Sequence, residues 1–320
     1  MARRKVAILG AAGFIGTNLY DTIAREVPRT FDRNPAQHVQ HVMDLSTERP
    51  DFTGCRAVVC CASTAHVWGK PIEDIRHEEK LVARMLTYAE EDGVDLFVHL
   101  SSSAVYGDYK PYYSEYDDLA PISKYGKQKV LAERAVRDWQ IMSFGRAKMK
   151  AVSIRVFNAV GKYQRRTMFP YIVVENALLG KVTPLYTAEH RSWTPVTDVC
   201  KFIMHIVDST SMAPGTFTVV NCGNPKPVPN SDVLNELSYL LKRRRLPQPK
   251  TERVHYRRNG EAGGYFCDMS KTLAWLIGLP PMGENLSKAL DDVIDTVLDN
   301  MRVEFQTPRL VARHDPLRAY

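Results

Sequence analysis

The stretch Val6-Ala-Ile-Leu9-Gly10-Ala-Ala-Gly13-Phe-Ile-Gly16 decides the fold of this 320-residue chain. A short apolar strand leads into three glycines at three-residue spacing, and a helical pattern over residues 17–26 follows. One glycine permits a tight turn, a second lets the backbone approach a pyrophosphate, and the third lets helix and strand pack closely. The first N–H groups of the helix offer a partial positive charge to phosphates. This stretch therefore predicts a dinucleotide-binding turn.

Strands and helices alternate along the first half of the chain. Apolar runs predict strands at 6–9, 29–32, 39–43, 57–61, 95–100 and 151–156, and helical patterns cover 17–26, 74–92 and 123–139. Alternation of this kind predicts a parallel sheet covered on both faces, that is, a doubly wound, Rossmann-like α/β fold. The segment from Arg25 to Pro50 is short, so we expect a loop in place of a helix after the second strand.

The pattern changes after residue 160, where proline-punctuated pieces and arginine-rich loops begin. We expect a cofactor-binding domain made of residues 1–160 together with about 189–222. A smaller α/β domain, made of residues 161–188 and 223–320, is expected to bind the substrate.

A second pair of segments carries the candidate chemistry. The run 95–100 ends at Ser101-Ser102-Ser103, and Tyr125 and Lys129 lie four residues apart in a predicted helix. Both side chains therefore project from one helix face. An ammonium beside a phenol favours the ionised phenol, which makes a tyrosine usable as a base near neutral pH. Ser102, at the end of its strand, would hydrogen-bond the same substrate oxygen.

Charge and composition exclude several other classes. The net charge is +7, but the basic residues are scattered apart from Lys242-Arg-Arg-Arg245 and the C-terminal tail, which favours solvated faces and a site for anionic phosphates over nucleic acid. No run is long enough to span a membrane. Met-Ala-Arg-Arg-Lys at the start mimics a signal peptide, but its removal would delete a strand. The six cysteines and nine histidines show no metal-ligand spacing, so we expect no metal and a reducing, cytoplasmic compartment.

Together these motifs resemble the extended short-chain dehydrogenase/reductase family, in the branch that acts on nucleotide sugars. The resemblance covers essentially the whole chain. Besides the glycines and the Tyr125/Lys129 pair, it rests on Ser-Ser-Ser-Ala-Val-Tyr-Gly at 101–107, Arg155-Val-Phe-Asn158-Ala-Val-Gly161, Arg191-Ser-Trp-Thr-Pro-Val-Thr-Asp198-Val, Asn221-Cys-Gly223 and Asp268-Met-Ser-Lys271. It implies a nucleoside-diphosphate sugar as substrate and a homodimer formed through helices 74–92 and 123–139.

The resemblance also implies the residues that hold a nicotinamide cofactor. Asp32 would accept hydrogen bonds from the adenosine ribose and repel a 2′-phosphate, which favours NAD. Arg33 is an argument against NAD, because an arginine there can bind the phosphate of NADP or stack on the adenine. NAD is the expected cofactor and NADP the alternative. The expected cofactor-binding residues are Gly10, Gly13, Phe14, Ile15, Gly16, Asp32, Arg33, Asp44, Leu45, Ala62, Tyr125 and Lys129.

The implied chemistry is hydride transfer at a sugar carbon. Tyr125 would remove the hydroxyl proton, Lys129 would hold the nicotinamide ribose, and Ser102 would orient the alcohol. Arginine suits the diphosphate because its fork pairs with phosphate oxygens. His66 is either an added acid–base group or a wall of the sugar site. The expected substrate-binding residues are Ser102, Ser103, His66, Asn158, Arg191 and Arg258.

Departures from the family pattern narrow the reaction. Dehydratases of this kind carry Asp-Glu where Ser103-Ala104 stand, and the decarboxylase branch carries Glu at Ala104, so both readings lose support. We therefore expect a C4 epimerase of an NDP-hexose that works through a transient 4-keto intermediate. The alternatives are an NAD(P)H-dependent NDP-4-keto-sugar reductase and, less favoured, a 4,6-dehydratase. A dinucleotide-sensing or RNA-binding protein of the same fold is disfavoured because such proteins typically lack the tyrosine–lysine pair. Glu78 and Gln128 stand where Asn and Ser are common, and the sequence offers no interpretation of them.

Overall fold

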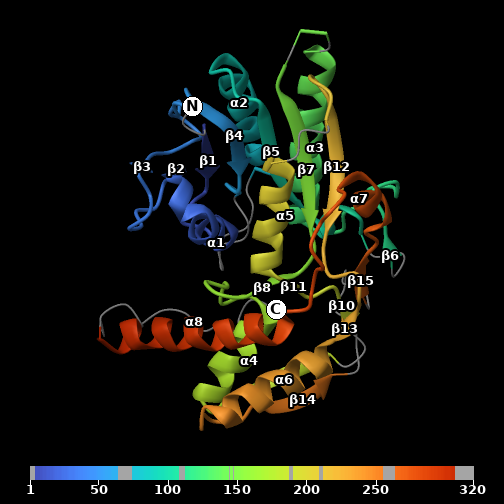
Figure 1. The fold of residues 1–320 in the computed structure, drawn as a ribbon. Helices are drawn as coiled ribbons and strands as arrows, with labels where there is room; N and C mark the ends of the chain where they lie inside the picture. Colours follow the sequence, from blue (N-terminus) through green and yellow to red (C-terminus); the bar gives the residue numbers. More distant parts are fainter. Residues whose placement is uncertain are drawn as a thin grey trace.

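The computed structural model describes residues 4–63, 74–107, 112–143, 145–146, 148–186, 190–208, 212–254 and 264–306. A seven-stranded parallel sheet, in the order β12-β7-β5-β4-β1-β2-β3, forms the centre of the molecule (Figure 1). Its strands are β1 (Lys5–Leu9), β2 (Arg29–Asp32), β3 (His41–Val42), β4 (Cys55–Cys60), β5 (Leu96–Ser102), β7 (Lys150–Val156) and β12 (Phe217–Cys222). The predicted doubly wound α/β fold is confirmed.

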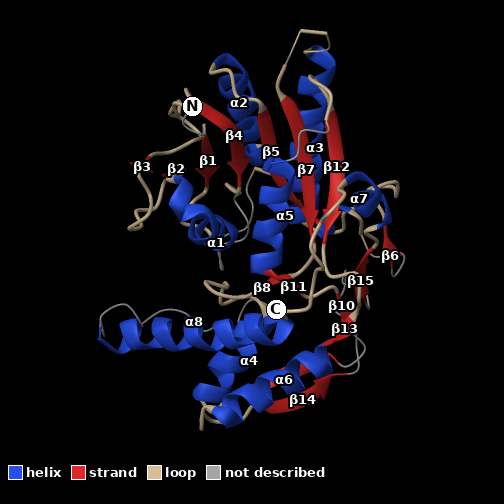
Figure 2. Ribbon diagram, viewed as in Figure 1, coloured by secondary structure: helices blue, strands red, loops and turns tan. Residues whose placement is uncertain are grey.

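Helices cover both faces of this sheet, as Figure 2 shows. The helices α1 (Phe14–Ile23) and α5 (Val196–Asp208) pack together, and α2 (His77–Glu91) packs along α3 (Lys124–Met142). The strand β1 explains the two layers, because adjacent side chains point to opposite faces. Val6 and Ile8 belong to the apolar core with α1 and α5, whereas Ala7 and Leu9 belong to the core with α2 and α3.

The first helix begins at Phe14, three residues before the predicted start. Gly13 is extended, with φ −78° and ψ 169°, and precedes the first helical residue. The third glycine, Gly16, therefore lies inside the helix rather than in the turn before it. No helix lies between β2 and β3, as expected from the short segment there.

Most of the remaining elements form a second group below the large sheet, whereas α7 and β6 lie beside its lower end (Figure 1). Helices α4, α6 and α8 share a separate apolar core with Val160 and Trp193. Small sheets join β13-β10-β15-β6, β11-β8 and β14-β9. The elements are β6 (Tyr112–Tyr113), β8 (Ala159–Val160), α4 (Phe169–Leu178), β9 (Val182–Tyr186), β10 (His190–Arg191), β11 (Thr194–Pro195), β13 (Val228–Pro229), α6 (Asn230–Arg243), β14 (Lys250–Val254), β15 (Gly264–Cys267), α7 (Ser270–Trp275) and α8 (Leu286–Gln306). Between α5 and α6 the chain returns to the large sheet as β12, which pairs with β7.

None of the described helices combines the length and apolar character needed to cross a membrane. All six cysteines are free thiols.

Candidate active site

The glycine turn leaves no room for side chains. Gly10 has φ +76°, and a Cβ there would lie 2.6 Å from the backbone nitrogen of Ala62, which follows β4. A Cβ on Gly16 would lie 2.2 Å from the carbonyl oxygen of Gly10. The start of α1 carries no side-chain cap, so its first N–H groups are not taken by the helix's own residues. This narrow turn, ending at an uncapped helix, fits a pyrophosphate.

Asp32 is the last residue of β2 and is held beside this turn. Its carboxylate accepts hydrogen bonds from the backbone nitrogens of Ala12 at 3.0 Å and Asn34 at 2.8 Å. The side chain is 7% exposed, whereas the neighbouring Arg33 is exposed. A buried carboxylate at this strand end fits the ribose hydroxyls of a dinucleotide.

Replacing Asp32 with alanine is expected to weaken NAD binding more than NADP binding. The change removes an acceptor for the ribose and, at the same time, the repulsion of a 2′-phosphate. Titrating both cofactors into the wild type and the variant, with tryptophan fluorescence as the signal, measures the ratio of the two dissociation constants. A wild type that prefers NADP would overturn the assignment of NAD.

Asp44 and Leu45 follow β3. The Asp44 carboxylate accepts hydrogen bonds from the Ser46 hydroxyl at 2.6 Å and its backbone nitrogen at 2.9 Å, and these bonds lower the pKa of Asp44. Leu45 is buried in the core that includes α2.

Ser102 and Tyr125 lie on elements that touch. Ser102 ends β5, and its hydroxyl accepts from the backbone nitrogen of Ala104 at 3.3 Å in the short η2 turn (Ser103–Val105). Tyr125 is half-buried in the first turn of α3. Gly126 makes the approach possible, because a Cβ there would lie 2.3 Å from the carbonyl oxygen of Ala104. The start of α3 thus packs directly against the chain that follows Ser102.

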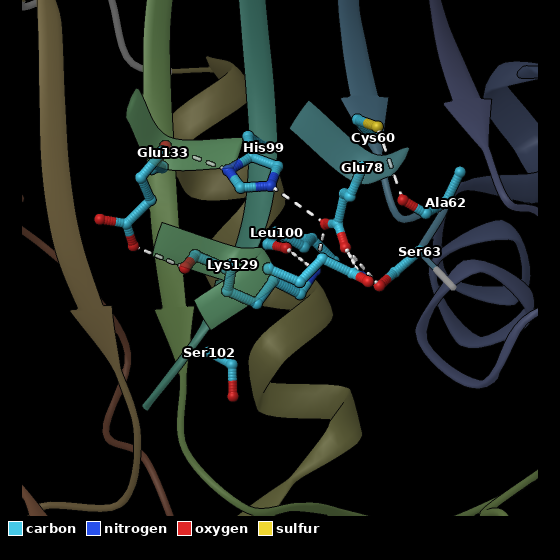
Figure 3. Close-up of polar contacts among 12 residues, drawn as sticks. Cys60, Ala62, Ser63, Glu78, His99, Leu100, Ser102, Lys129 and Glu133 are labelled. Atoms are coloured by element: carbon cyan, nitrogen blue, oxygen red, sulfur yellow. Dashed lines mark hydrogen bonds and ion pairs between the residues drawn. The ribbon is translucent and has the colours of Figure 1, made fainter. Parts of the chain in front are cut away.

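Lys129 lies one turn after Tyr125 on α3 and is 3% exposed. Its ammonium is 5.7 Å from the centre of the Tyr125 ring, so the predicted pairing on one helix face is present. The same ammonium donates to the Glu78 carboxylate at 2.6 Å and to the Leu100 carbonyl at 2.7 Å (Figure 3). Lys129 is therefore part of a buried ion pair between α3 and α2.

Glu78 is the residue that the sequence reading left without a role. It is fully buried and lies in the apolar stripe of α2, in line with Val82, Met85 and Ala89. A carboxylate on the core-facing stripe of an amphipathic helix is the signal that marks it, because buried charges need partners. Glu78 finds that partner in Lys129.

The two groups of this pair hold each other in their charged forms. Burial by itself raises the pKa of Glu78, but the Lys129 ammonium and a hydrogen bond from His99 outweigh it and hold that pKa below its usual range. Burial conversely lowers the pKa of Lys129, and the attraction of Glu78 outweighs it and raises that pKa. Both shifts keep the pair ionised throughout the neutral range.

The expected substrate residues that the structure describes lie on several different elements. Asn158 follows β7, has φ +29°, and carries a buried side-chain nitrogen without a hydrogen-bond partner in the described part of the protein. An unpaired buried donor in a rare backbone conformation suits an acceptor-rich ligand. Arg191 is half-buried on β10, and Ser103 is buried in the η2 turn. His66 and Arg258 lie outside the described residues.

Across the described ranges, no group of three or more His, Cys, Asp or Glu side chains could hold a metal ion.

Comparisons with known proteins agree on one family. The profile of the NAD dependent epimerase/dehydratase family matches residues 6–223. The uncharacterized UDP-glucose epimerase YtcB of Bacillus subtilis is 24% identical over 232 residues, which are 63% of this chain and 72% of that protein. ADP-L-glycero-D-manno-heptose-6-epimerase of Pseudomonas aeruginosa is 27% identical over 176 residues, 49% of this chain and 51% of that one.

Solved structures agree on the fold. MoeE5, in complex with UDP-glucuronic acid and NAD, superposes with a TM-score of 0.79 at 24% identity and covers 92% of this chain and 99% of its own. UDP-glucuronic acid 4-epimerase from Bacillus cereus, in complex with UDP-glucuronic acid and NAD, gives a TM-score of 0.78 at 20% identity over 92% and 99%.

Proposed function

This chain belongs to the NAD-dependent epimerase/dehydratase family, and from that premise we propose that it is a nucleotide-sugar epimerase acting at C4 of an NDP-hexose. The proposal rests on three features gathered along the carboxyl ends of the central strands: a glycine turn without room for side chains, a buried carboxylate at the end of β2, and a tyrosine–lysine pair. The UDP-sugar complexes of its structural neighbours add support for a nucleotide-sugar substrate.

The residues present fit NAD. Gly10, Gly16 and the start of α1 would cradle its pyrophosphate, and Asp32 would accept from its adenosine ribose. When bound, NAD would supply a reversible acceptor for hydride.

The chain's own residues would manage the proton and the position of the sugar. Tyr125, in its ionised form, takes the proton of the C4 hydroxyl, and Ser102 orients the same oxygen. Lys129 favours the ionised phenol through its charge. Asn158 and Arg191 hold the diphosphate while the ketone turns its opposite face toward the site. Epimerisation requires this turn, because the hydrogen returns to the same carbon from the other side.

The η2 turn is the observation that favours an epimerase over a dehydratase. Ser103 and Ala104 follow Ser102 there, and neither side chain can transfer a proton at neutral pH. Elimination of water needs an additional acid and base at the sugar.

An untargeted panel tests the proposed function. The purified protein is incubated with UDP-, GDP-, dTDP- and CDP-sugars, and products are read by mass spectrometry and NMR. We expect two hexoses of equal mass to interconvert without added cofactor. A product two mass units away that forms only with added NAD(P)(H) would indicate the ketoreductase instead, and loss of water would indicate a dehydratase.

The same proposal includes the organisation of the molecule. Residues 1–160 with about 189–222 form the cofactor domain, and 161–188 with 223–320 form the substrate domain. The protein acts in the cytoplasm as a homodimer that uses α2 and α3, as the resemblance to the extended short-chain dehydrogenase/reductase family implies.

A further inference from the structure

The Glu78 carboxylate is surrounded by hydrogen-bond donors. Its Oε1 lies 2.6 Å from Lys129 Nζ and 3.4 Å from His99 Nε2. Its Oε2 accepts from Ser63 Oγ at 2.7 Å and from Gln128 Nε2 at 2.5 Å. Figure 3 shows Glu78 between His99, Ser63 and Lys129, with Ser102 apart from them on its strand. Lys129, Gln128 and Ser63 donate to the two oxygens, and the lowered pKa of Glu78 keeps the carboxylate ionised, which assigns the donor role to His99 Nε2 as well.

These groups come from three parts of the fold. Ser63 follows β4, His99 is on β5, and Gln128 and Lys129 are neighbours on α3. His99, Gln128 and Lys129 are themselves buried. The arrangement therefore fixes Glu78 against a lysine one turn from Tyr125, and it excludes water from the contact.

We propose that Glu78 is a positioning residue for the Tyr125–Lys129 pair, holding the ammonium at the Leu100 carbonyl and offsetting its charge so that Tyr125 loses its proton at a higher pH than it would beside an uncompensated ammonium. This inference deepens the proposed function and rests on it where turnover is measured. Glu78 and Gln128 stand where Asn and Ser are common in the family. The inference gives both a role, since Glu78 holds Lys129 and Gln128 donates to Glu78.

The physical reason is a balance of nearby charges. A lone ammonium close to a phenol favours the phenolate. A carboxylate 2.6 Å from that ammonium makes the pair nearly neutral as seen from the ring, so the stabilisation falls. Other titratable groups that interact with the pair include His99 on β5, Cys60 on β4 and Cys61 directly after it. Burial raises the pKa of the Cys60 thiol to about 12, which leaves it uncharged at neutral pH.

Glu78→Gln tests this role through the pH profile. The variant removes the negative charge at nearly constant shape, so the ammonium acts on Tyr125 without compensation. Turnover is measured against pH and divided by its plateau value. We expect the midpoint on the acid side of this profile to move toward lower pH by on the order of one unit. Below the midpoint the variant then keeps about a tenfold larger fraction of its plateau rate than the wild type does. Glu78→Asp keeps the charge and is expected to keep the wild-type midpoint.

Two control variants separate positioning from general damage. Glu133→Gln breaks another buried ion pair on α3, in which Arg155 lies 2.7 Å from Glu133, two turns beyond Tyr125. It should lower stability and leave the midpoint unchanged. His99→Gln removes the second titratable partner of Glu78. Equal shifts in His99→Gln and Glu78→Gln would assign the ionisation to the histidine and overturn the proposal, as would a Glu78→Gln midpoint equal to that of the wild type.

A spectroscopic titration keeps this test independent of the substrate. The tyrosinate absorbance of the wild type minus that of Tyr125→Phe reports the ionisation of Tyr125 alone, in protein as purified. The same difference in the Glu78→Gln background should titrate about one unit lower. This readout stands even if the sugar panel finds no turnover. The same midpoint in the wild-type and Glu78→Gln backgrounds would contradict the proposed offset.

Discussion

Replacing Tyr125 with phenylalanine is expected to lower turnover by on the order of a hundredfold or more while the fold and cofactor binding survive. The ring, its half-buried packing and its place over the Lys129 ammonium are all retained, and only the proton-accepting oxygen is lost. Steady-state turnover of the sugar found in the panel, with NAD binding measured on the same samples, gives both quantities.

Tyr239→Phe is the matched control for this change. Tyr239 is 56% exposed on α6, and its loss of a hydroxyl should leave turnover at the wild-type level. Should Tyr125→Phe keep its activity, another residue is the base, and His66 is the first to replace.

Replacing Lys129 with methionine is expected to cost turnover, cofactor affinity and stability together. Turnover and affinity fall because the ammonium beside Tyr125, and its expected contact with the nicotinamide ribose, are lost. Stability falls because Glu78 keeps a buried charge without its nearest cation, which costs about 3–5 kcal/mol in comparable cases. Urea unfolding measures the last effect, and kinetics with cofactor titration measure the first two.

Two further variants divide these losses. Lys129→Met combined with Glu78→Gln removes both charges, so much of the stability should return while turnover does not. Lys127→Met removes an exposed lysine from the same helix and should leave all three quantities near wild type. Full turnover in Lys129→Met would exclude this lysine from the chemistry.

Much of the fold could be predicted from the sequence because its signals are local. The apolar run ending at Leu9, the glycines after it and the later alternation of strands and helices each depend on residues close along the chain. The parallel sheet and the loop after β2 were confirmed, whereas the start of α1 was wrong by three residues. Helix starts are the weakest of these signals, since Gly13 can either continue a turn or stand as an extended residue before a helix.

The sequence by itself determined the glycine turn and the placement of Tyr125 and Lys129 on one helix face, because a spacing of three or four residues fixes such neighbours within a single element. Only the tertiary structure decided what surrounds Lys129. Glu78 and Lys129 are 51 residues apart and meet because α2 packs along α3, and Leu100 reaches the same ammonium from β5. A buried charge takes its partner from whichever element packs against it, and that choice is made by the whole fold rather than by any local stretch.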